Sequence, residues 1–542
     1  MYLLRLLETD TRNAYKGIIV LTVLAGVGNA ALIGLINQAA EKAALSETVS
    51  LRDLILYVLV FAFYYVANRA SLKESNRFLQ ERLSFLRLRV VGKIRSAPLR
   101  TLEGIGHGQL FAAVAQEMNH LSQNLPLFAA AAQGGFLLLF CLFYIATLSV
   151  PSFLLIAAFT VVGLFIFWRR RIALNKALEE VYAHEAAMLD SMANFTEGFQ
   201  EIRLNACKND SLFRHFSEIV TDLERAVVGV GGRWVMLLQF SNIFLYALLG
   251  LVILVLPMFF EGATDTIYKI AAAALFCIGP VTAITAVSHL YARAAVGLGH
   301  VYRLEDELDR AEPQPKPPAV ASRFAGFQRI DFESIRFSYL DSQGQALFTS
   351  GPWDLTLNRG ETVFLTGGNG SGKSTMMKVV CGLYTPGEGR ILVDGDPVTE
   401  ASRQTYREMF TAIFPDFHLF DRLHGLGEVD PAAVTKQIEW MELAKKVTFS
   451  DGRFSTLDLS TGQRKRLAMV VSLLEDRDIY LFDEWAADQD AHFREIFYTE
   501  ILPELKRRGK TVLAVTHDER YWSRCDRRLV LDLGSVVPPG DG

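Results

Sequence analysis

A glycine-rich run with a lysine and a serine at its end has the residue types of a phosphate-binding loop. Residues 367–374 read Gly-Gly-Asn-Gly-Ser-Gly-Lys-Ser and fit the pattern G-x-x-x-x-G-K-[ST]. Glycines let successive backbone N–H groups curl around an anion, and a helix that follows adds its positive N-terminal end. The residues expected to bind the phosphates are Gly367, Asn369, Gly370, Ser371, Gly372, Lys373, Ser374 and Thr375. Lys373 would supply a mobile charge and the Ser374 hydroxyl a ligand for Mg²⁺.

Two further segments end in side chains suited to hydrolysis of a bound nucleotide. Residues 478–484 predict a buried strand that ends in Asp483 and Glu484. We expect Asp483 to hold Mg²⁺, directly or through a water, and Glu484 to orient and polarise the attacking water. Residues 511–516 predict another strand, and His517 after it can reach the γ-phosphate. The alternatives are that the carboxylates only cap the next helix and that the histidine is structural, but the phosphate loop upstream favours catalysis.

These side chains need an α/β domain to position them. The β-branched and apolar run 362–365 predicts the strand before the phosphate loop, and residues 375–380 predict the helix after it. Residues 327–542 therefore read as one α/β phosphate-loop ATPase domain. Before it, residues 309–326 are a proline-rich linker that includes Glu-Pro-Gln-Pro-Lys-Pro-Pro.

The first 308 residues have a different character, that of an all-α membrane domain. Hydrophobic residues make up 51% of the 542-residue chain and are concentrated in this part. Six segments are long and apolar enough to span a membrane: 17–38, 54–67, 127–148, 151–168, 234–258 and 270–290. No charged residue lies between Phe136 and Phe167, whereas one charge at the bilayer centre costs about 3 kcal/mol. Pro151 divides this run into two spans joined by a tight turn. Buried helices of a large soluble core are the alternative.

Basic residues predict the orientation of these spans. Lys and Arg are frequent between spans two and three and between spans four and five, and they are sparse in the other connections. The positive-inside rule then places both long loops, both termini and the phosphate loop in the cytoplasm. The loops are polar and helix-forming, so we expect spans two to five to continue below the membrane as long helices. They would meet the ATPase domain there.

The N-terminal residues, the cysteines and the net charge do not point to any additional function. The first ten residues lack a cleavable-signal pattern and predict an amphipathic helix before the first span. The five cysteines have neither metal-ligand nor disulfide spacing, so we expect structural roles for them. The net charge of −4 does not suggest a nucleic-acid partner, and topology accounts for the basic residues.

A second glycine-containing segment completes a recognisable set of motifs. Residues 459–463 read Leu-Ser-Thr-Gly-Gln ahead of a helix-forming run, which makes a second anion-binding N-terminus. The segment resembles the LSGGQ signature of ATP-binding-cassette proteins, with Thr461 in place of a glycine. The phosphate loop, this signature, the acidic pair and His517 match the family in order and spacing. Six spans ahead of one such domain resemble an exporter-type half-transporter, and the resemblance covers essentially the whole chain.

The resemblance implies further site residues and a partner. Tyr339 matches the aromatic residue that stacks on adenine, and Asp490 matches the D-loop aspartate. Ser460, Gly462 and Gln463 match the signature residues that bind the γ-phosphate held by a second copy. The family therefore implies a homodimer with two shared ATP sites, although a heterodimer with a sister chain stays open.

Three departures from the family pattern narrow the resemblance. Pro415 occupies the position of a glutamine that contacts Mg²⁺, Trp485 follows the catalytic glutamate, and the helical subdomain is compact. Together with residues 197–205 (Glu-Gly-Phe-Gln-Glu-Ile-Arg-Leu-Asn), these traits resemble Gram-negative exporters of cyclic peptides, siderophore precursors and lipopeptides, such as the pyoverdine and syringomycin exporters. The loop that contains Pro415 would normally link Mg²⁺ to the membrane domain, and without the glutamine it must do so by its shape or through Asp416.

The expected function is ATP-driven export of such an amphiphilic peptide-like molecule across a bacterial inner membrane. The alternatives are a lipid or drug exporter, an importer of metal–siderophore complexes with an exporter fold, and a membrane sensor ATPase. Polar residues within the spans are candidates both for lining a cavity and for hydrogen bonds between helices: Asn29, Gln133, Gln239, Asn242, Thr282, Thr285 and Ser288.

Overall fold

The computed structural model describes residues 5, 14–44, 50–255, 258, 269–273, 275, 278–311, 324–341 and 344–538. By its internal contacts the chain divides into two compact units. The helical unit comprises Met1–Lys93 and Gly106–Glu307, and the sheet unit comprises Ile94–Ile105 and Leu308–Gly542. The predicted N-terminal amphipathic helix, apart from Arg5, and most of the predicted linker lie outside the described residues.

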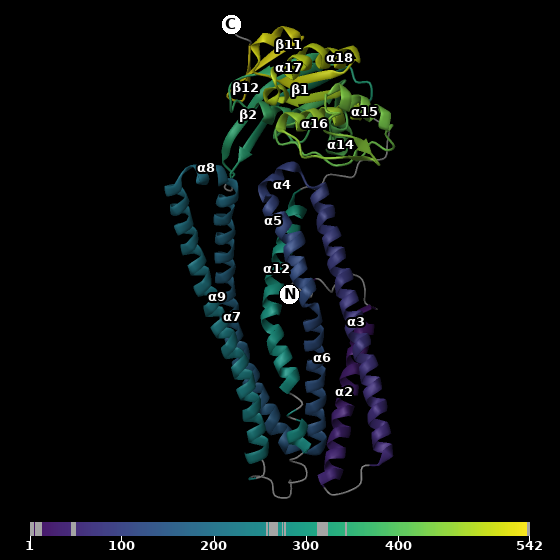
Figure 1. Cartoon of the computed structure of the whole chain (residues 1–542), viewed down its shortest axis with the longest axis vertical. Coiled ribbons are helices and arrows are strands. Elements are labelled where there is room, and N and C mark those ends of the chain that lie inside the picture. The colour runs from purple at the N-terminus through teal and green to yellow at the C-terminus, as the bar shows by residue number, and fades with distance from the viewer. Residues whose placement is uncertain are drawn as a thin grey trace. The chain divides into compact units, whose positions relative to one another are not determined.

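Long helices make up the helical unit (Figure 1). They are α2 (Ala14–Ala44), α3 (Leu51–Ser96), α5 (His107–Phe111), α6 (Met118–Leu148), α7 (Val150–Glu197), α8 (Phe199–Leu204), α9 (Ala206–Gly250) and α12 (Ile278–Arg310), with π-helical turns at Ala112–Glu117 and Leu251–Val255. Among the described residues, five helices are long and apolar enough to cross a membrane. The predicted span 270–290 lies partly outside the described residues, and α12 covers its second half.

Helices α3, α7 and α9 are much longer than a bilayer is thick. With 46 residues in α3 and 48 in α7, their lengths are about 69 and 72 Å, whereas the hydrocarbon core measures about 30 Å. The apolar stretch predicted at 54–67 ends at Asn68, but α3 continues because charged residues on a helix surface end a membrane span without ending the helix. Of the extensions expected for spans two to five, those of spans two, four and five are therefore present, and α7 and α9 run side by side (Figure 1).

The turn between α6 and α7 is as short as the sequence predicted. Helix α6 ends at Leu148, and α7 begins at Val150. Ser149 caps α7 by accepting a hydrogen bond from the Ser152 backbone N–H, and Pro151 sits in the first turn, where its missing N–H costs nothing.

Polar side chains within the spans bond across helices. The Gln133 side chain donates to Ser71 Oγ at 3.2 Å, joining α6 to α3, and Ser241 lies 3.1 Å from Thr285, joining α9 to α12. For Gln133 and Thr285 this supports the helix–helix alternative. Gln133 also lines, with Asn29, a cavity of about 280 Å³, so the two uses coexist there.

The sheet unit is built around a mainly parallel sheet with the strand order β12-β11-β3-β10-β9-β6. Its strands are β3 (Thr362–Thr366), β6 (Phe410–Ile413), β9 (Ile479–Asp483), β10 (Thr511–Val515), β11 (Arg527–Asp532) and β12 (Ser535–Val537). An antiparallel sheet, β2-β1-β4-β5, is formed by β1 (Arg329–Leu340), β2 (Ala346–Asn358), β4 (Glu388–Val393) and β5 (Asp396–Pro397). The helices include α4 (Leu99–Ile105), α13 (Lys373–Val380), α14 (Arg403–Arg407), α15 (Pro431–Trp440), α16 (Thr461–Glu475), α17 (Ala491–Ile496) and α18 (Leu502–Arg507).

The parallel sheet is buried on both faces, which explains its continuous apolar strands. Val363 and Leu365 of β3 pack into one core with the antiparallel sheet and α13, whereas Phe364 packs into a second core with α15 and α16. This alternation follows from the two-residue period of a strand. The predicted strands at 362–365, 478–484 and 511–516 correspond to β3, β9 and β10, which are neighbours in the order β3-β10-β9.

Candidate functional site

The predicted phosphate loop connects β3 to the N-terminus of α13. Parallel pairing places the carboxyl ends of β3, β10 and β9 at one edge of the sheet. The loop follows β3, His517 follows β10, and Asp483 and Glu484 end β9. The topology therefore gathers these predicted residues from three separate stretches of sequence.

The backbone of the loop explains its glycines. Gly367 has φ of +147°, and a Cβ there would lie 2.1 Å from the Leu531 carbonyl oxygen of β11. Strands β11 and β12 form a hairpin, and this hairpin also bonds to the loop, because the Gly534 backbone N–H donates to the Ser371 carbonyl at 2.9 Å. The β11–β12 hairpin thus forms one wall of the loop. Only a residue without a side chain can approach that wall so closely.

Lys373 and Ser371 point polar groups into the loop. The Lys373 side chain is 6% exposed, and its Nζ donates to the carbonyls of Gly367 at 3.2 Å and Gly368 at 2.9 Å. The Ser371 hydroxyl is buried without a hydrogen-bond partner among the described residues. A buried ammonium and a buried hydroxyl in a glycine-rich loop ahead of a helix suit a phosphate.

Asp483 has the features of a magnesium ligand. The residue is 1% exposed, and its Oδ2 has no hydrogen-bond partner in the described parts of the chain. Burial raises the pKa of this carboxyl, while a hydrogen bond from the Ser374 hydroxyl opposes the rise. A buried carboxylate oxygen without a partner beside a serine hydroxyl fits the oxygen ligands that Mg²⁺ prefers, so Asp483 and Ser374 could hold the ion.

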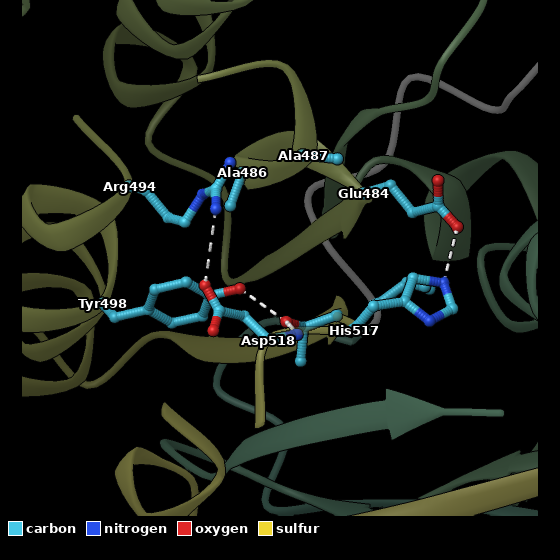
Figure 2. Close-up of a pocket in the computed structure, with 9 residues that line it drawn as sticks. Glu484, Ala486, Ala487, Arg494, Tyr498, His517 and Asp518 are labelled. Carbon is cyan, nitrogen blue, oxygen red and sulfur yellow. Dashed lines mark hydrogen bonds and ion pairs between the residues drawn. The ribbon is translucent and has the colours of Figure 1, made fainter. Parts of the chain in front are cut away.

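Glu484 and His517 both line a pocket and face each other there (Figure 2). His517 Nε2 lies 3.0 Å from Glu484 Oε1, and the two side chains are 46% and 37% exposed. Glu484 has a left-handed backbone, with φ of +51° and ψ of +37°, which turns the chain sharply at the end of β9. This geometry leaves the carboxylate accessible to a water and oriented by the histidine, as a residue that activates water requires.

The signature residues form a separate group. Ser460 caps α16 through a reciprocal capping box with Gln463, and Asp490 caps α17 by accepting from the Phe493 N–H at 2.8 Å. Gly462 lies against Asp488, since a Cβ there would be 2.9 Å from the Asp488 carbonyl oxygen. In the part of the chain that the structure describes, no hydrogen bond or ion pair joins these predicted residues to the phosphate loop.

The predicted adenine-stacking residue lies beside the helix of the phosphate loop. Tyr339 Oη is 3.3 Å from Thr375 Oγ1 and 3.4 Å from Tyr384 Oη. The Tyr339 ring meets Phe337 edge to face, with centroids 5.2 Å apart. Tyr339 is thus fixed at its hydroxyl end, near the start of α13.

Comparison with known proteins identifies the family. The description "ABC transporter" belongs to the family profile that matches residues 351–487. The ATP-binding protein SyrD of Pseudomonas syringae pv. syringae is 31% identical over 531 residues, covering 95% of this chain and 92% of SyrD. The chain belongs to the ABC transporter family. An ATP-dependent lipid A-core flippase of Hahella chejuensis is 27% identical over 49% of this ABC transporter and 46% of the flippase.

A solved structure agrees on the fold. A bacterial Atm1-family ABC exporter with ATP bound superposes with a TM-score of 0.78, covering 98% of this ABC transporter and 95% of that chain at 16% identity. The predicted fold class, membrane helices joined to an α/β ATPase domain, is confirmed. The chain is an ABC exporter that binds ATP with Mg²⁺ and couples ATP hydrolysis to transport, and it is embedded in a membrane.

The positions where this ABC transporter departs from its family have local structural roles. Pro415 lies just after β6, in a turn closed by the Phe417 N–H donating to the Phe414 carbonyl at 3.3 Å. A proline has no side-chain amide, so this residue cannot contact a metal as a glutamine would. Trp485 is fully buried, stacks on Phe497 with centroids 4.8 Å apart, and donates from Nε1 to the Lys465 carbonyl at 2.9 Å.

Lys465 is a site residue that the sequence did not reveal. Its side chain is 3% exposed, and its Nζ donates to the Glu484 carbonyl at 2.8 Å and pairs with Asp488 Oδ2 at 2.7 Å. One ammonium therefore ties α16 to the backbone of the predicted catalytic glutamate. A lysine on a helix surface is normally expected to be solvated, but this one contacts the segment Glu484–Asp488 and is buried.

Replacing Lys465 by methionine should lower ATPase kcat more than it changes ATP affinity. The Glu484 carbonyl would lose its charged donor, which should lower the free energy of unfolding by about 1–3 kcal/mol. The left-handed turn at Glu484 would also be held less firmly. Steady-state ATPase assays and thermal unfolding of the full chain would measure both effects. Lys445→Met, at an exposed position, is the matched control and should leave both unchanged. An unchanged kcat in Lys465→Met would contradict this role for the buried ammonium.

Proposed function

We propose that this ABC exporter moves an amphiphilic peptide-like molecule, namely a cyclic peptide, siderophore precursor or lipopeptide, out across a bacterial inner membrane. The observation that carries the proposal is the 31% identity to SyrD over almost the full length of both chains. It agrees with the resemblance of residues 197–205 and of the Pro415 loop to the same exporter subgroup.

The helical unit offers a cavity of suitable chemistry. It measures about 320 Å³ and lies among α6, α7, α9 and α12. Leu138, Phe240 and Phe244 are among its apolar lining residues, and its hydroxyl groups include Ser241 and Thr285, which already bond to each other. An apolar cavity whose described lining residues include no charged side chain favours an amphiphile over an ionic solute.

Within the ATPase domain we assign each gathered residue a step. Lys373 and the backbone N–H groups of the phosphate loop bind the β- and γ-phosphates, and Tyr339 stacks on adenine. Ser374 and Asp483 would hold Mg²⁺, which would neutralise charge on the phosphates. Glu484 orients the attacking water, and His517, 3.0 Å from its carboxylate, senses the γ-phosphate.

The separate signature group supports a homodimer. Ser460, Gly462 and Gln463 stand at the N-terminus of α16, a 15-residue helix whose positive end can bind phosphate. They have no bonded contact with the phosphate loop of their own chain within the described residues. A second copy related by two-fold symmetry would supply this end to the first copy's ATP, with Asp490 beside it.

The distribution of charge supports a cytoplasmic ATPase domain in a multi-pass inner-membrane protein. Basic residues are concentrated in the loops between spans two and three and between spans four and five, in keeping with the positive-inside rule. These loops contain the second halves of α3 and α7 and the first half of α9. ATP is then available on the side where it is hydrolysed. Closure of two ATP-bound domains would drive the outward step of alternating access, and hydrolysis would reset it.

Transport itself is the test of this proposal. The purified protein in inside-out proteoliposomes should accumulate a labelled cyclic lipopeptide or siderophore precursor when ATP is supplied outside, and it should not do so when Glu484 is replaced by glutamine. In lipid nanodiscs the same compounds should stimulate wild-type ATPase activity. Stimulation without accumulation would favour a sensor, and ATP-driven loss of a metal–siderophore complex preloaded in the vesicles would favour an importer.

A lipid exporter is the second candidate because of the 27% identity to the lipid A-core flippase. The same vesicles distinguish the two functions. Fluorescent lipid moving between leaflets on addition of ATP, together with no uptake of peptides, would replace the peptide proposal by this one.

A further inference from the structure

The apolar cavity among α6, α7, α9 and α12 is elongated along the helices. Its lining on α7 runs from Ile156 to Phe167, a distance of about 16 Å at the rise of an α-helix. With a volume of about 320 Å³, the cavity is therefore long and narrow. Two of its lining residues, Leu139 and Leu164, are exposed, so one side of the cavity opens onto the apolar surface of the helical unit.

The hydroxyl groups that line this cavity already have hydrogen-bond partners. Those of Thr160, Ser241 and Thr285 lie 2.7, 3.1 and 2.8 Å from the carbonyl oxygen four residues earlier in their own helices. A ligand therefore finds few groups among the described lining residues that can replace its hydrogen bonds to water. Each backbone amide of a peptide placed there would be left without a partner, whereas an alkyl chain has no hydrogen bonds to lose.

A row of aromatic rings leads from this cavity to a cation. Phe159 stacks on Phe244 with centroids 4.6 Å apart, and the Phe244 ring lies 6.1 Å from that of Phe240. The Arg170 guanidinium lies 5.5 Å from the centroid of the Phe240 ring. Phe240 lines the cavity, and so does Phe167, one turn before Arg170 on the same face of α7. Arg170 thus stands at one end of the apolar cavity.

Arg170 also lies where α7 leaves its uncharged stretch. The chain has no charged residue from Phe136 to Trp168, and Arg169 is the first that follows. Trp168 is 60% exposed, as is typical of an aromatic residue at a membrane interface. The side chain of Arg170 is exposed as well. An arginine at such a boundary can bind a carboxylate or phosphate with two parallel hydrogen bonds.

We propose that this cavity is the subsite for a fatty-acyl chain of the transported molecule and that Arg170 binds an anionic group next to that chain. An alkyl chain matches the apolar lining, and the exposed side of the cavity lets the chain enter from the bilayer. The arginine complements an anionic group that stays at the membrane boundary. This inference rests on the proposed function, and among its three substrate classes it selects molecules that are both acylated and acidic.

Four synthetic peptides of one sequence test the subsite. Two carry an N-terminal dodecanoyl chain and two an acetyl group, and in each pair the first residue is either aspartate or asparagine. Each peptide is added to the full chain in phosphatidylcholine nanodiscs, and the concentration that gives half-maximal stimulation of ATPase activity is measured. Comparing variants with the same peptide cancels the partition of that peptide into the bilayer. The dodecanoyl-aspartate peptide should stimulate the parent protein most strongly.

Filling the cavity should weaken the response to the acylated peptides. Gly135 lines the cavity, and a Cβ there would meet no atom within 4 Å, so Gly135→Leu adds a side chain without a clash. The half-maximal concentration of the dodecanoyl-aspartate peptide should rise about tenfold or more, because the leucine takes space where methylene groups would be buried. Gly17→Leu, at an exposed and equally open position of α2, is the matched control and should respond as the parent does. Thermal unfolding shows that both variants are folded. A full response in Gly135→Leu would overturn the acyl subsite.

Removing the cation should affect only the acidic peptide. Arg170→Gln should raise the half-maximal concentration of the dodecanoyl-aspartate peptide about tenfold and leave that of the dodecanoyl-asparagine peptide unchanged. Arg214→Gln removes an exposed arginine elsewhere, on α9, and should change neither value. Equal losses for both peptides in Arg170→Gln, or no loss for either, would overturn the role of Arg170.

Failure of this inference is distinguishable from failure of the proposed function. If inside-out proteoliposomes accumulate acetyl and dodecanoyl peptides equally well and Gly135→Leu changes neither, peptide export stands and the acyl subsite is wrong. If no peptide stimulates ATPase activity or is accumulated, the proposed function fails and the inference with it. If Gly135→Leu and Arg170→Gln alter only the response to added phosphatidylglycerol, the cavity binds a bilayer lipid instead of the cargo, and the inference is overturned.

Discussion

Replacing Glu484 by glutamine should lower the ATPase rate by about 10²- to 10⁴-fold, the contribution expected of a group that activates water. Glutamine has the same shape and can still meet His517, which lies 3.0 Å from the carboxylate in the native protein. It cannot accept a proton from the attacking water. Binding of ATP should therefore persist, because Lys373 and the phosphate-loop backbone bind the phosphates, whereas Glu484 acts only on the attacking water. Single-turnover hydrolysis and equilibrium binding of labelled ATP would measure the two effects separately.

A matched control for this variant is Glu495→Gln, an exposed carboxylate on α17, which should hydrolyse ATP at the normal rate. A near-normal rate in Glu484→Gln would remove Glu484 from the mechanism. Attention would then turn to His517.

Replacing Lys373 by alanine should weaken MgATP binding by about 10- to 100-fold, since charged hydrogen bonds contribute about 1.5–3 kcal/mol. The lysine is 6% exposed, and its ammonium bonds to the loop carbonyls of Gly367 and Gly368, where the outer phosphates would bind. The fold should survive, because Lys373 begins α13 and alanine is a good helix former. Titration with labelled nucleotide, together with thermal unfolding, would measure affinity and stability.

Lys436→Ala, an exposed lysine on α15, controls for the loss of one positive charge and should bind MgATP normally. If Lys373→Ala bound MgATP with native affinity, the phosphate loop would have to bind through its backbone alone. The proposed division of roles in the site would then need revision.

The motifs predicted the elements of the ATPase domain because their chemistry requires a particular local backbone. A phosphate loop works only between a strand and a helix, so residues 367–374 by themselves implied β3 and α13. The acidic pair and His517 likewise implied β9 and β10, and parallel strand order then brought them to one edge. Boundaries of the membrane helices were less predictable. Apolar length defines the part of α3 within the bilayer and not the place where the helix ends.

The contacts that sequence could not predict join residues far apart in the chain. Glu103 and Tyr384 are 281 residues apart, and neither belongs to a motif. Lys465 has the charge of a solvated helix residue, yet it is buried and contacts Glu484 and Asp488 in the segment after β9. Periodicity reports which face of an element is apolar. It does not report which polar group from another element comes to lie against that face.

The wall that β11 and β12 build beside the phosphate loop has a practical consequence for labelling this transporter. Gly534 holds the Ser371 carbonyl, and Leu531 leaves no room for a side chain at Gly367. A fluorescent reporter inserted between Asp532 and Ser535 would separate this hairpin from the loop and disable ATP binding from a position remote in sequence. A reporter joined after Val537 leaves the hairpin whole, which makes that end the better attachment point for following the protein in living cells.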